Sequence, residues 1–223
     1  MIIRPCTDAD LSVLCSRWRT PGDLHERHHD HQRDGQTIYL VAWQDQEPLG
    51  SGVLQCGGCI GLNARTAYPG AVEFNHLQVR DQYRGQGVGS ALIAAAEALA
   101  SQAGRDQIAV GVAEDNPDAE RLYRRLGYHP TGVIDVSRYD WITAEGAVRH
   151  ETERDHLLVK DLGPTMGLAQ REHLSRSEAI CRALADLAAW TGEHPVQVAP
   201  HGGLLCAEVG RWMTGPARRK VSP

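Results

Sequence analysis

A glycine-rich turn at residues 84–90 carries the most chemical information in this sequence. It reads Arg-Gly-Gln-Gly-Val-Gly-Ser, follows a strand-like run at 72–79 and opens into a run with helical periodicity at 90–102. The first N–H groups of a helix have no partner inside the helix, and they lie at the positive end of its dipole. Glycines let the backbone approach a ligand closely and adopt positive φ. The turn therefore predicts a binding site for a phosphate or pyrophosphate group.

The spacing of the turn excludes two common phosphate loops. A Walker A loop ends in Gly-Lys-Ser/Thr, whereas this turn ends in Val88-Gly89-Ser90 without a lysine. A dinucleotide fingerprint needs G-x-G-x-x-G, whereas Gly85, Gly87 and Gly89 give G-x-G-x-G. The pattern that fits is Arg/Gln-x-x-Gly-x-Gly/Ala, which begins at residue 84.

A second motif follows at residues 116–128, after a buried-strand pattern at 107–112. It reads Asn-Pro-Asp-Ala-Glu-Arg-Leu-Tyr-Arg-Arg-Leu-Gly-Tyr. Asn116 suits the N-cap of a helix, Pro117 its first turn and Gly127 its C-terminal cap. The motif therefore predicts a complete short helix that carries a tyrosine, Tyr123, beside its apolar face.

Together the two motifs resemble the signatures of the GNAT superfamily of N-acetyltransferases. The first is similar to the acyl-CoA loop of that superfamily, and the second to its Asn-x-x-Ala-x-x-Leu-Tyr-x-x-x-Gly-Phe/Tyr motif. The resemblance covers residues 1–162 and implies an α/β (α+β) fold, with a mixed, mostly antiparallel sheet of six to seven strands flanked by helices. The flanking patterns agree: a strand at 1–4, a helix at 8–19, a hairpin at 37–43 and 49–55, and closing strands at 132–139 and 156–161.

By this resemblance, acetyl-CoA is the acyl donor, and the acetyl group passes directly to a primary amine without an acyl-enzyme. The pantetheine arm is expected between the strands at 72–79 and 107–112, where a backbone N–H would polarise the thioester carbonyl. The residues implied in cofactor binding are Leu77, Gln78, Val79, Arg84, Gly85, Gln86, Gly87, Val88, Gly89, Ser90, Asn116 and Tyr123.

Acetyl transfer to an alkylammonium, whose pKa is near ~10, requires a proton acceptor. Strand alternation places Glu73, Asn75, Leu77 and Val79 on one face and His76 on the other. Some family members use a glutamate near this position, so Glu73 is the candidate general base. His76 is the second candidate, because its ordinary pKa is closer to neutrality. Alternatively, Glu73 is a solvated or salt-bridged carboxylate and His76 a packed or surface histidine.

The departing thiolate of CoA needs a proton, and Tyr123 occupies the position of the family's general acid. A phenol with a pKa near ~10 can donate without prior ionisation. The alternative is that Tyr123 only packs on its helix, as tyrosines on amphipathic helices usually do. Asn116 also has two compatible roles, because an N-cap asparagine needs no ligand and the family position often binds the cofactor arm.

Two further clusters lie outside the family signatures. Residues 23–31 are rich in histidine and acid, and His25, His28 and His29 share a helical face. No closed ligand set is evident, so no metal site is predicted, and a polar helix or loop beside the acceptor site is preferred. Cys56-Gly57-Gly58-Cys59 has no second cysteine pair, so a flexible glycine loop is favoured over a zinc or redox site.

Residues 163–223 extend beyond the family core, after a boundary at Gly163-Pro164. An apolar stripe at 179–188 predicts a helix, and a second apolar segment follows at 204–213 before a basic, flexible end. The stripe must be buried, either against the domain formed by residues 1–162 or against a second subunit. A homodimer through this extension is therefore one of the open possibilities.

Composition limits the protein class. The formal net charge of −5 over 223 residues argues against a broad nucleic-acid surface. No run reaches the roughly twenty apolar residues of a membrane span, and the start of the chain does not resemble a signal peptide. Six cysteines are too few for a disulfide scaffold in a chain of this length. We therefore expect a cytoplasmic protein without membrane or nucleic-acid partners.

Three functional classes follow. The first is a CoA-dependent N-acetyltransferase whose acceptor is a small-molecule or peptide amine. The second is a non-catalytic acyl-CoA sensor or regulatory module with the same fold. The third is a metal- or partner-binding protein that uses the histidines and the extension. The acceptor stays open, since fold alone does not specify a substrate.

Overall fold

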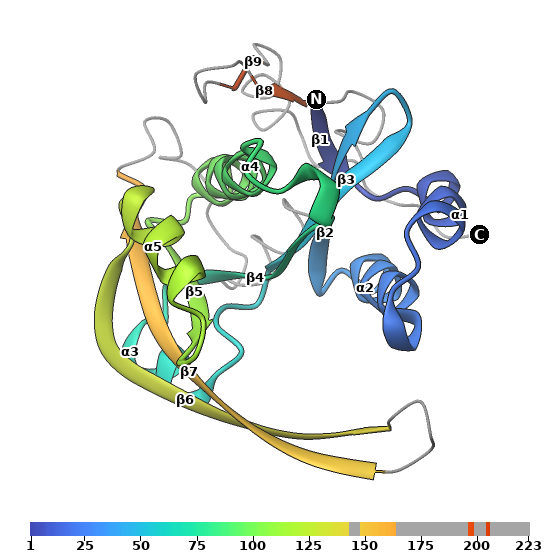
Figure 1. Ribbon diagram of the computed structural model, residues 1–223. Coiled ribbons are helices and arrows are strands. Elements are labelled where there is room, and N and C mark those ends of the chain that lie inside the picture. The colour runs from blue at the N-terminus through green and yellow to red at the C-terminus, as the bar shows by residue number, and fades with distance from the viewer. Residues whose placement is uncertain (143–147, 164–195, 199–203, 206–223) are drawn as a thin grey trace, which may run out of the picture.

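The structure is a computed structural model that describes residues 1–142, 148–163, 196–198 and 204–205. Its elements follow one another in the order β1 (Ile2–Pro5), α1 (Asp8–Arg17), η1 (Pro21–Asp23), α2 (Leu24–Arg33), β2 (Thr37–Gln44), β3 (Glu47–Gln55), α3 (Leu62–Ala67), β4 (Val72–Val79), η2 (Asp81–Tyr83), α4 (Val88–Gln102), β5 (Gln107–Ala113), α5 (Pro117–Arg125), β6 (His129–Ile142), β7 (Val148–Asp161), β8 (Val196–Val198) and β9 (Leu204–Leu205). Figure 1 shows these elements around one sheet.

The sheet has nine strands in the order β6-β7-β5-β4-β3-β2-β1-β8-β9. Among the pairs that the structure describes, β4 with β5 is parallel and the others are antiparallel. Strands β1 to β7 form the mixed, mostly antiparallel sheet that the sequence predicts. β8 and β9 add two short strands of the C-terminal extension beyond β1.

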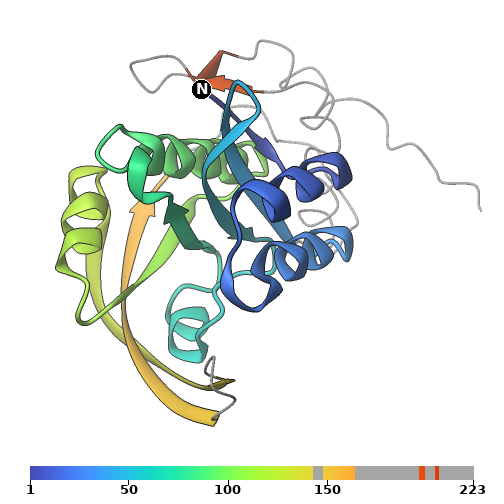
Figure 2. The same cartoon turned by 45° about the vertical axis from the view of Figure 1, so that its right-hand side comes forward.

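Helices cover both faces of the sheet. α4 and α5 pack on one face, whereas α1, α2 and α3 lie on the other (Figure 2). β2 is buried along nearly its whole length because both of its faces are covered. Ile38 and Leu40 point into the α4 core, and Tyr39 and Val41 into the α1 core.

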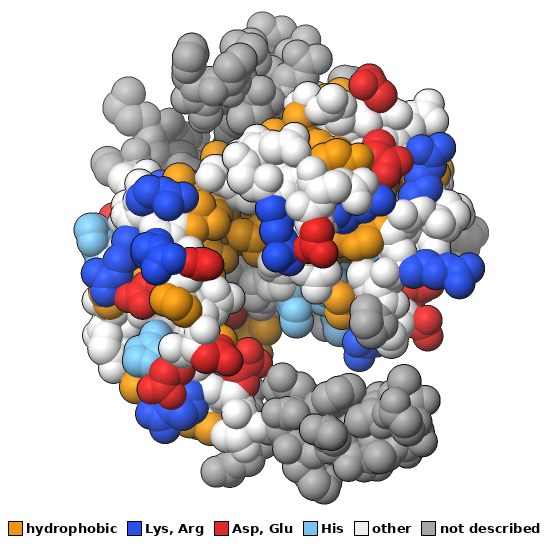
Figure 3. Space-filling model, viewed as in Figure 1, with side chains coloured by type: hydrophobic (Ala, Val, Ile, Leu, Met, Phe, Trp, Pro, Cys, Tyr) orange, Lys and Arg blue, Asp and Glu red, His pale blue; other side chains and the backbone are white. Residues whose placement is uncertain are grey.

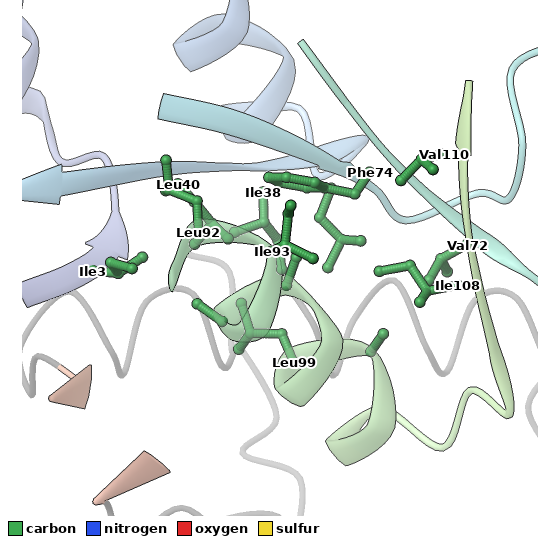
Figure 4. Packing of buried hydrophobic residues seen from close by; sticks show 14 of the residues in the cluster. Ile3, Ile38, Leu40, Val72, Phe74, Leu92, Ile93, Leu99, Ile108 and Val110 are labelled. Carbon is green, nitrogen blue, oxygen red and sulfur yellow. The ribbon is translucent and has the colours of Figure 1, made fainter. Parts of the chain in front are cut away.

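The main core lies between α4 and the sheet. Leu92, Ile93 and Leu99 of α4 pack in one cluster with apolar side chains of β1, β2, β3, β4, β5 and β7, and Figure 4 labels those of β1, β2, β4 and β5. The ring of Phe74 reaches this core by passing over Gly52, where a Cβ would lie 2.2 Å from the ring. The helical spacing of alanine and leucine in α4 therefore fixes the face that the helix turns to the sheet.

Three elements differ from the sequence-based expectations. β6 and β7 are longer than the expected strands at 132–139 and 156–161 and form a ribbon that curves beneath the domain (Figure 1). The pairing continues to Ile142 and Val148, and the added part of β7 includes the polar run at 149–155, which an apolar pattern cannot indicate. α3 was not expected. The expected helix at 179–188 lies outside the described residues, and the division at residues 162 and 163 stays a prediction.

No helix in the described part of the chain combines the length and the apolar character needed to cross a membrane.

Candidate active site

The glycine-rich turn ends at the N-terminus of α4, as its sequence predicts. Gly87 is the N-cap residue with φ of 83°, and Gly85 has φ of 73°. A Cβ at either position would meet nothing within 4 Å, so the backbone conformation, and not space, requires glycine. No side chain in the described residues caps this helix end. The first N–H groups of α4, from Val88 onward, therefore suit an anionic ligand.

The polar side chains of the turn lie on the surface. The Arg84 guanidinium lies 2.9 Å from the Asp81 carboxylate in an exposed ion pair, and its Nε donates to the Val79 carbonyl at 3.4 Å. Gln86 donates to the Gln82 carbonyl at 2.9 Å. Exposed ion pairs contribute little to stability. The Arg84 guanidinium can therefore leave Asp81 and contact a phosphate at a small cost in free energy.

β4 and β5 separate shortly after they begin to pair. Their parallel register joins Val72 to Ile108 and Glu73 to Ala109, and no later residue of β4 pairs with β5. The segment of Leu77, Gln78 and Val79 lies past this point and pairs only with β3 among the described strands. The structure thus contains the split between strands in which the resemblance places the pantetheine arm.

A β-bulge in β4 alters which side chains share a face. Gln78 pairs with Ser51 and Asn75 with Val53, so two residues of β4 lie opposite Gly52 alone. Leu77 and Val79 therefore pack on the α4 side of the sheet, with the main core. The expectation that they share a face with Glu73 and Asn75 is wrong, because the extra residue reverses the alternation.

The bulge also moves His76. This residue has φ of 49°, which is uncommon outside glycine, and its ring lies 4.8 Å from the ring of His28 on α2. α2 lies on the same side of the sheet as Glu73, so the expectation that His76 and Glu73 occupy opposite faces is also wrong. The bulge brings both candidate proton acceptors to one side of the split.

Glu73 is held firmly in place. The residue is only 8% exposed, and its Oε2 accepts a hydrogen bond from the Ile60 backbone N–H at 2.8 Å. Asn75 donates weakly to Oε1 at 3.4 Å. Burial raises the pKa of Glu73 against the lowering effect of these hydrogen bonds. Its role as general base stays a prediction.

His76 is exposed to solvent, but side chains of α2 and β7 are close enough to act on its ring. Partial desolvation and the Arg27 guanidinium lower the pKa of His76, and the Glu153 carboxylate opposes them. Its neighbour His28 is 8% exposed, and Nε2 of His28 has no hydrogen-bond partner within the described residues. Burial, then His76 and Arg27, lowers the pKa of His28 to about 4. Both rings are therefore neutral at physiological pH.

Carboxylates gather on the same side of the sheet. Asp135 of β6 accepts the backbone N–H groups of Asn63 and Ala64, each at 2.9 Å, at the start of α3. Burial raises the pKa of Asp155 to about 6, and the carboxylates of Glu153, Glu73 and Asp135 add to the shift. Figure 3 shows acidic side chains and histidines of the described residues beside a hollow in the surface.

Tyr123 lies on the opposite side, within the main core. It is 5% exposed, and its ring meets that of Tyr128 edge to face with centroids 5.5 Å apart. Burial raises the pKa of Tyr123 to about 12, so its hydroxyl stays protonated. Asn116 caps α5 by accepting the Ala119 N–H at 3.1 Å, as predicted for an N-cap. Whether Asn116 or Tyr123 contacts a cofactor stays a prediction.

Two other histidines of α2, His25 and His29, have structural partners. Nε2 of His25 donates to the Trp18 carbonyl at 2.7 Å, so Nδ1 accepts the Tyr39 hydroxyl at 2.5 Å. His29 lies 3.2 Å from Asp8. Within the described residues, no group of three or more His, Cys, Asp or Glu side chains could hold a metal ion.

The two cysteines of the C-x-x-C segment are both buried, in different clusters of apolar side chains. Cys56 packs in the α4 core and Cys59 beside α3, with no disulfide between them. Burial raises the pKa of Cys59 to about 12, which makes it a poor nucleophile.

The sequence indicates residues 23–31, which include His28, beside the acceptor site, but Asp135, Glu153 and Asp155 were not anticipated as neighbours of the site. Glu153 and Asp155 lie two residues apart in β7, and this alternation was the available signal for a shared face. Nothing in the sequence indicated that β7 would meet the bulge in β4.

A sequence profile described as the acetyltransferase (GNAT) family matches residues 9–128, more than half of the chain. The chain belongs to this GNAT family. The match spans the turn at 84–90, the split between β4 and β5, and α5. No curated protein matches the chain.

Solved structures show the same fold at low sequence identity. smu.2055 from Streptococcus mutans is 17% identical, with a TM-score of 0.53 over 73% of this GNAT chain and 100% of its own. yncA from Salmonella typhimurium, a putative acetyltransferase solved with its cofactor acetyl-CoA, is 16% identical, with a TM-score of 0.52 over 78% and 99%. A phosphinothricin acetyltransferase from Sinorhizobium meliloti, in complex with AcCoA, is 20% identical, with a TM-score of 0.51 over 76% and 91%.

Proposed function

We propose that this protein is an N-acetyltransferase that uses acetyl-CoA to acetylate a primary amine. One observation carries the proposal: the uncapped glycine turn before α4 and the split between β4 and β5 occur together in a GNAT fold. The first offers backbone N–H groups to a pyrophosphate, and the second offers strand edges to an extended arm. Family membership makes acetyl-CoA the donor.

The residues present fit this donor. The backbone of 84–90 would hold the pyrophosphate, and the backbone of Leu77, Gln78 and Val79 would hold the arm along the unpaired part of β4. Asn116 lies at the start of α5 and Tyr123 on the core side of this helix. In the family motif, both positions are next to the path of the cofactor arm. Acetyl-CoA supplies the activated acetyl group as a thioester.

The reaction then requires two proton movements on opposite sides of the sheet. Tyr123 gives a proton to the sulfur, and its hydroxyl carries that proton at neutral pH because burial raises its pKa to about 12. A side chain of β4 takes a proton from the ammonium group of the acceptor, for which Glu73 is the candidate from the family position. The buried thiols support direct transfer, since Cys59 is a poor nucleophile.

The acceptor class is a primary amine. A ribosomal-protein-alanine N-acetyltransferase from Brucella melitensis and a phosphinothricin acetyltransferase share the fold at 20% identity, which supports no choice between peptide and small-molecule acceptors. The polar elements around the hollow, α2 and β7, are those that would meet the acceptor.

Calorimetric titration with acetyl-CoA and desulfo-CoA tests the donor site first. Micromolar binding is expected, and it should disappear when Gly87 and Gly89 are both replaced by valine. CoA release is then measured with spermidine, an aminoglycoside, phosphinothricin and a peptide with a free N-terminal alanine. Binding without transfer to any of these amines would favour the acyl-CoA sensor, and absence of binding at millimolar acetyl-CoA would refute the proposal.

A further inference from the structure

Two side chains of β4 compete for the proton of the acceptor amine, and they lie at different points of the split. Glu73 is the last residue of β4 that pairs with β5. His76 lies three residues further on, in the bulge, next to the segment 77–79 that is expected to hold the acyl arm. Glu73 is therefore at the closed end of the split and His76 at its open part.

The surroundings of the two side chains also differ, since Glu73 is the more enclosed and His76 the more accessible. Glu73 is 8% exposed, and its Oε2 is occupied by the Ile60 N–H. His76 is exposed and has its ring against that of His28 on α2. A proton acceptor must reach the amine and afterwards release the proton to solvent. His76 meets both requirements, whereas Glu73 is buried and has one of its two carboxylate oxygens engaged by the Ile60 N–H.

The backbone at His76 also differs from that of its neighbours. A φ of 49° lies in the left-handed region, which residues other than glycine adopt only at an energetic cost. Such outliers persist where the surrounding structure enforces them, and they are concentrated at functional positions. Here the bulge turns the ring from the core face to the α2 side.

The charges that face His76 leave the ring neutral. Partial desolvation and then the Arg27 guanidinium of α2 lower the pKa of His76, and the Glu153 carboxylate of β7 raises it by a smaller amount. A neutral imidazole is the form that accepts a proton. His28 is itself neutral and buried, so it supports the ring without adding a second positive charge.

We propose that His76 accepts the proton of the acceptor ammonium group and that His28 positions its ring. This inference rests on the proposed function. The ammonium nitrogen loses one proton to a ring nitrogen of His76, and its lone pair then forms the C–N bond while the C–S bond breaks. Tyr123 protonates the sulfur and regains the second proton of the nitrogen. His76 releases its own proton to solvent, so one proton is liberated per turnover.

His76→Asn is the sharpest test, because asparagine tolerates the left-handed backbone at this position. Transfer is measured with whichever amine in the panel above reacts fastest. We expect kcat/KM to fall about 100-fold, and the acid limb of its pH profile, centred below pH 6.5, to disappear. Acetyl-CoA affinity should be unchanged. His129→Asn, which removes an exposed histidine of β6, is the matched control and should retain both rate and pH profile.

His76→Gly provides a second, independent readout. Glycine accepts the same φ and leaves room for a free base, so added imidazole should restore activity at least about tenfold. A merely structural role for His76 would give no rescue. His28→Phe keeps the ring contact and should lower kcat less than fivefold, about the effect of a small displacement of the base.

Two outcomes would overturn the inference alone. One is transfer by His76→Asn at the unsubstituted rate. The other is loss of activity and of the acid limb in Glu73→Gln while His76→Asn keeps both. Failure of the unsubstituted protein to acetylate any amine would instead refute the proposed function.

Discussion

The two sides of the split between β4 and β5 are formed by different kinds of chemical group. On the α4 side, the site consists of backbone N–H groups, glycines and an apolar core that contains Leu77, Val79 and Tyr123. On the α2 side, it consists of histidine rings and carboxylates from α2, β4, β6 and β7. In the proposed function, the first side would bind the donor through the backbone of one continuous segment, and the second would bind the acceptor through side chains that only the tertiary structure brings together.

This difference explains what each side can do. Backbone donors at a helix terminus are fixed and sequence-independent, which suits a donor that is the same throughout the family. Side chains of separate elements can be exchanged one at a time, which suits an acceptor that differs between members. The predictions below test this division, since changes on the donor side should alter cofactor affinity and changes on the acceptor side should not.

The largest effect is expected at Gly87. Valine at φ of 83° is strongly disfavoured, so Gly87→Val should distort the first turn of α4 and lower acetyl-CoA affinity at least about 100-fold by calorimetry. Gly89→Ala is the matched control. A Cβ there would be in ordinary contact, 3.6 Å from Val79, and we expect affinity within about fivefold. Equal losses in both variants would show that space, and not backbone conformation, governs the turn.

Tyr123→Phe separates chemistry from binding on the donor side. Removing the hydroxyl should lower kcat about 10- to 300-fold and leave acetyl-CoA affinity unchanged, because the ring still packs against Tyr128. Tyr128→Phe removes the hydroxyl of the neighbouring ring and should change kcat by less than about twofold. The general-acid assignment would be wrong if the two variants had the same turnover.

The donor side could be predicted from the sequence because its determinants are local. A strand, a glycine turn and a helix are contiguous at residues 72–102, and Asn116 and Pro117 mark the start of α5 by cap chemistry alone. The seven strands predicted along the chain follow from the same local patterns and the family resemblance. The first half of β7 was missed because residues 149–155 are polar and pair with β6 without an apolar pattern.

The acceptor side could be predicted only in part. Glu73 and His76 were identified as candidates, but strand alternation assigned them to opposite faces. A bulge of one residue moves every later side chain of the strand to the other face of the sheet, and no turn residue or proline in β4 indicates the bulge. The approach of His28 and Asp155 to this strand depends on long-range packing, which local sequence does not encode.

Asp155→Asn tests the charge on the acceptor side through stability. The folded-state pKa of Asp155 is raised from 3.8 to about 6 by burial and neighbouring carboxylates, so the folded protein holds this proton more tightly than the unfolded chain. The unsubstituted protein should therefore lose stability relative to the variant as the pH rises from 4 through 6.

In urea unfolding at pH 8, we expect the Asp155→Asn variant to be more stable by about 1 kcal/mol, a value reduced for the partial exposure of the group. The difference should vanish below pH 4. Acetyl-CoA affinity should not change, since Asp155 lies on the acceptor side. Asp115→Asn, in an exposed turn before α5, is the control and should show no such dependence on pH. A stabilisation that persisted at pH 4 would contradict the proposed repulsion.

The smallest effect is expected at Arg84, the one charged side chain of the glycine turn. Its ion pair with Asp81 is exposed, so Arg84→Gln should change the free energy of unfolding by less than about 0.5 kcal/mol. Acetyl-CoA affinity should fall about threefold at low salt and less at 0.5 M salt, because exposed charges are screened. Arg80→Gln removes a less exposed guanidinium that binds Glu47 and the Pro48 carbonyl, and it should lower stability instead. If Arg84→Gln abolished binding, a side chain and not the backbone would dominate the donor side, and the contrast between the two sides would fail.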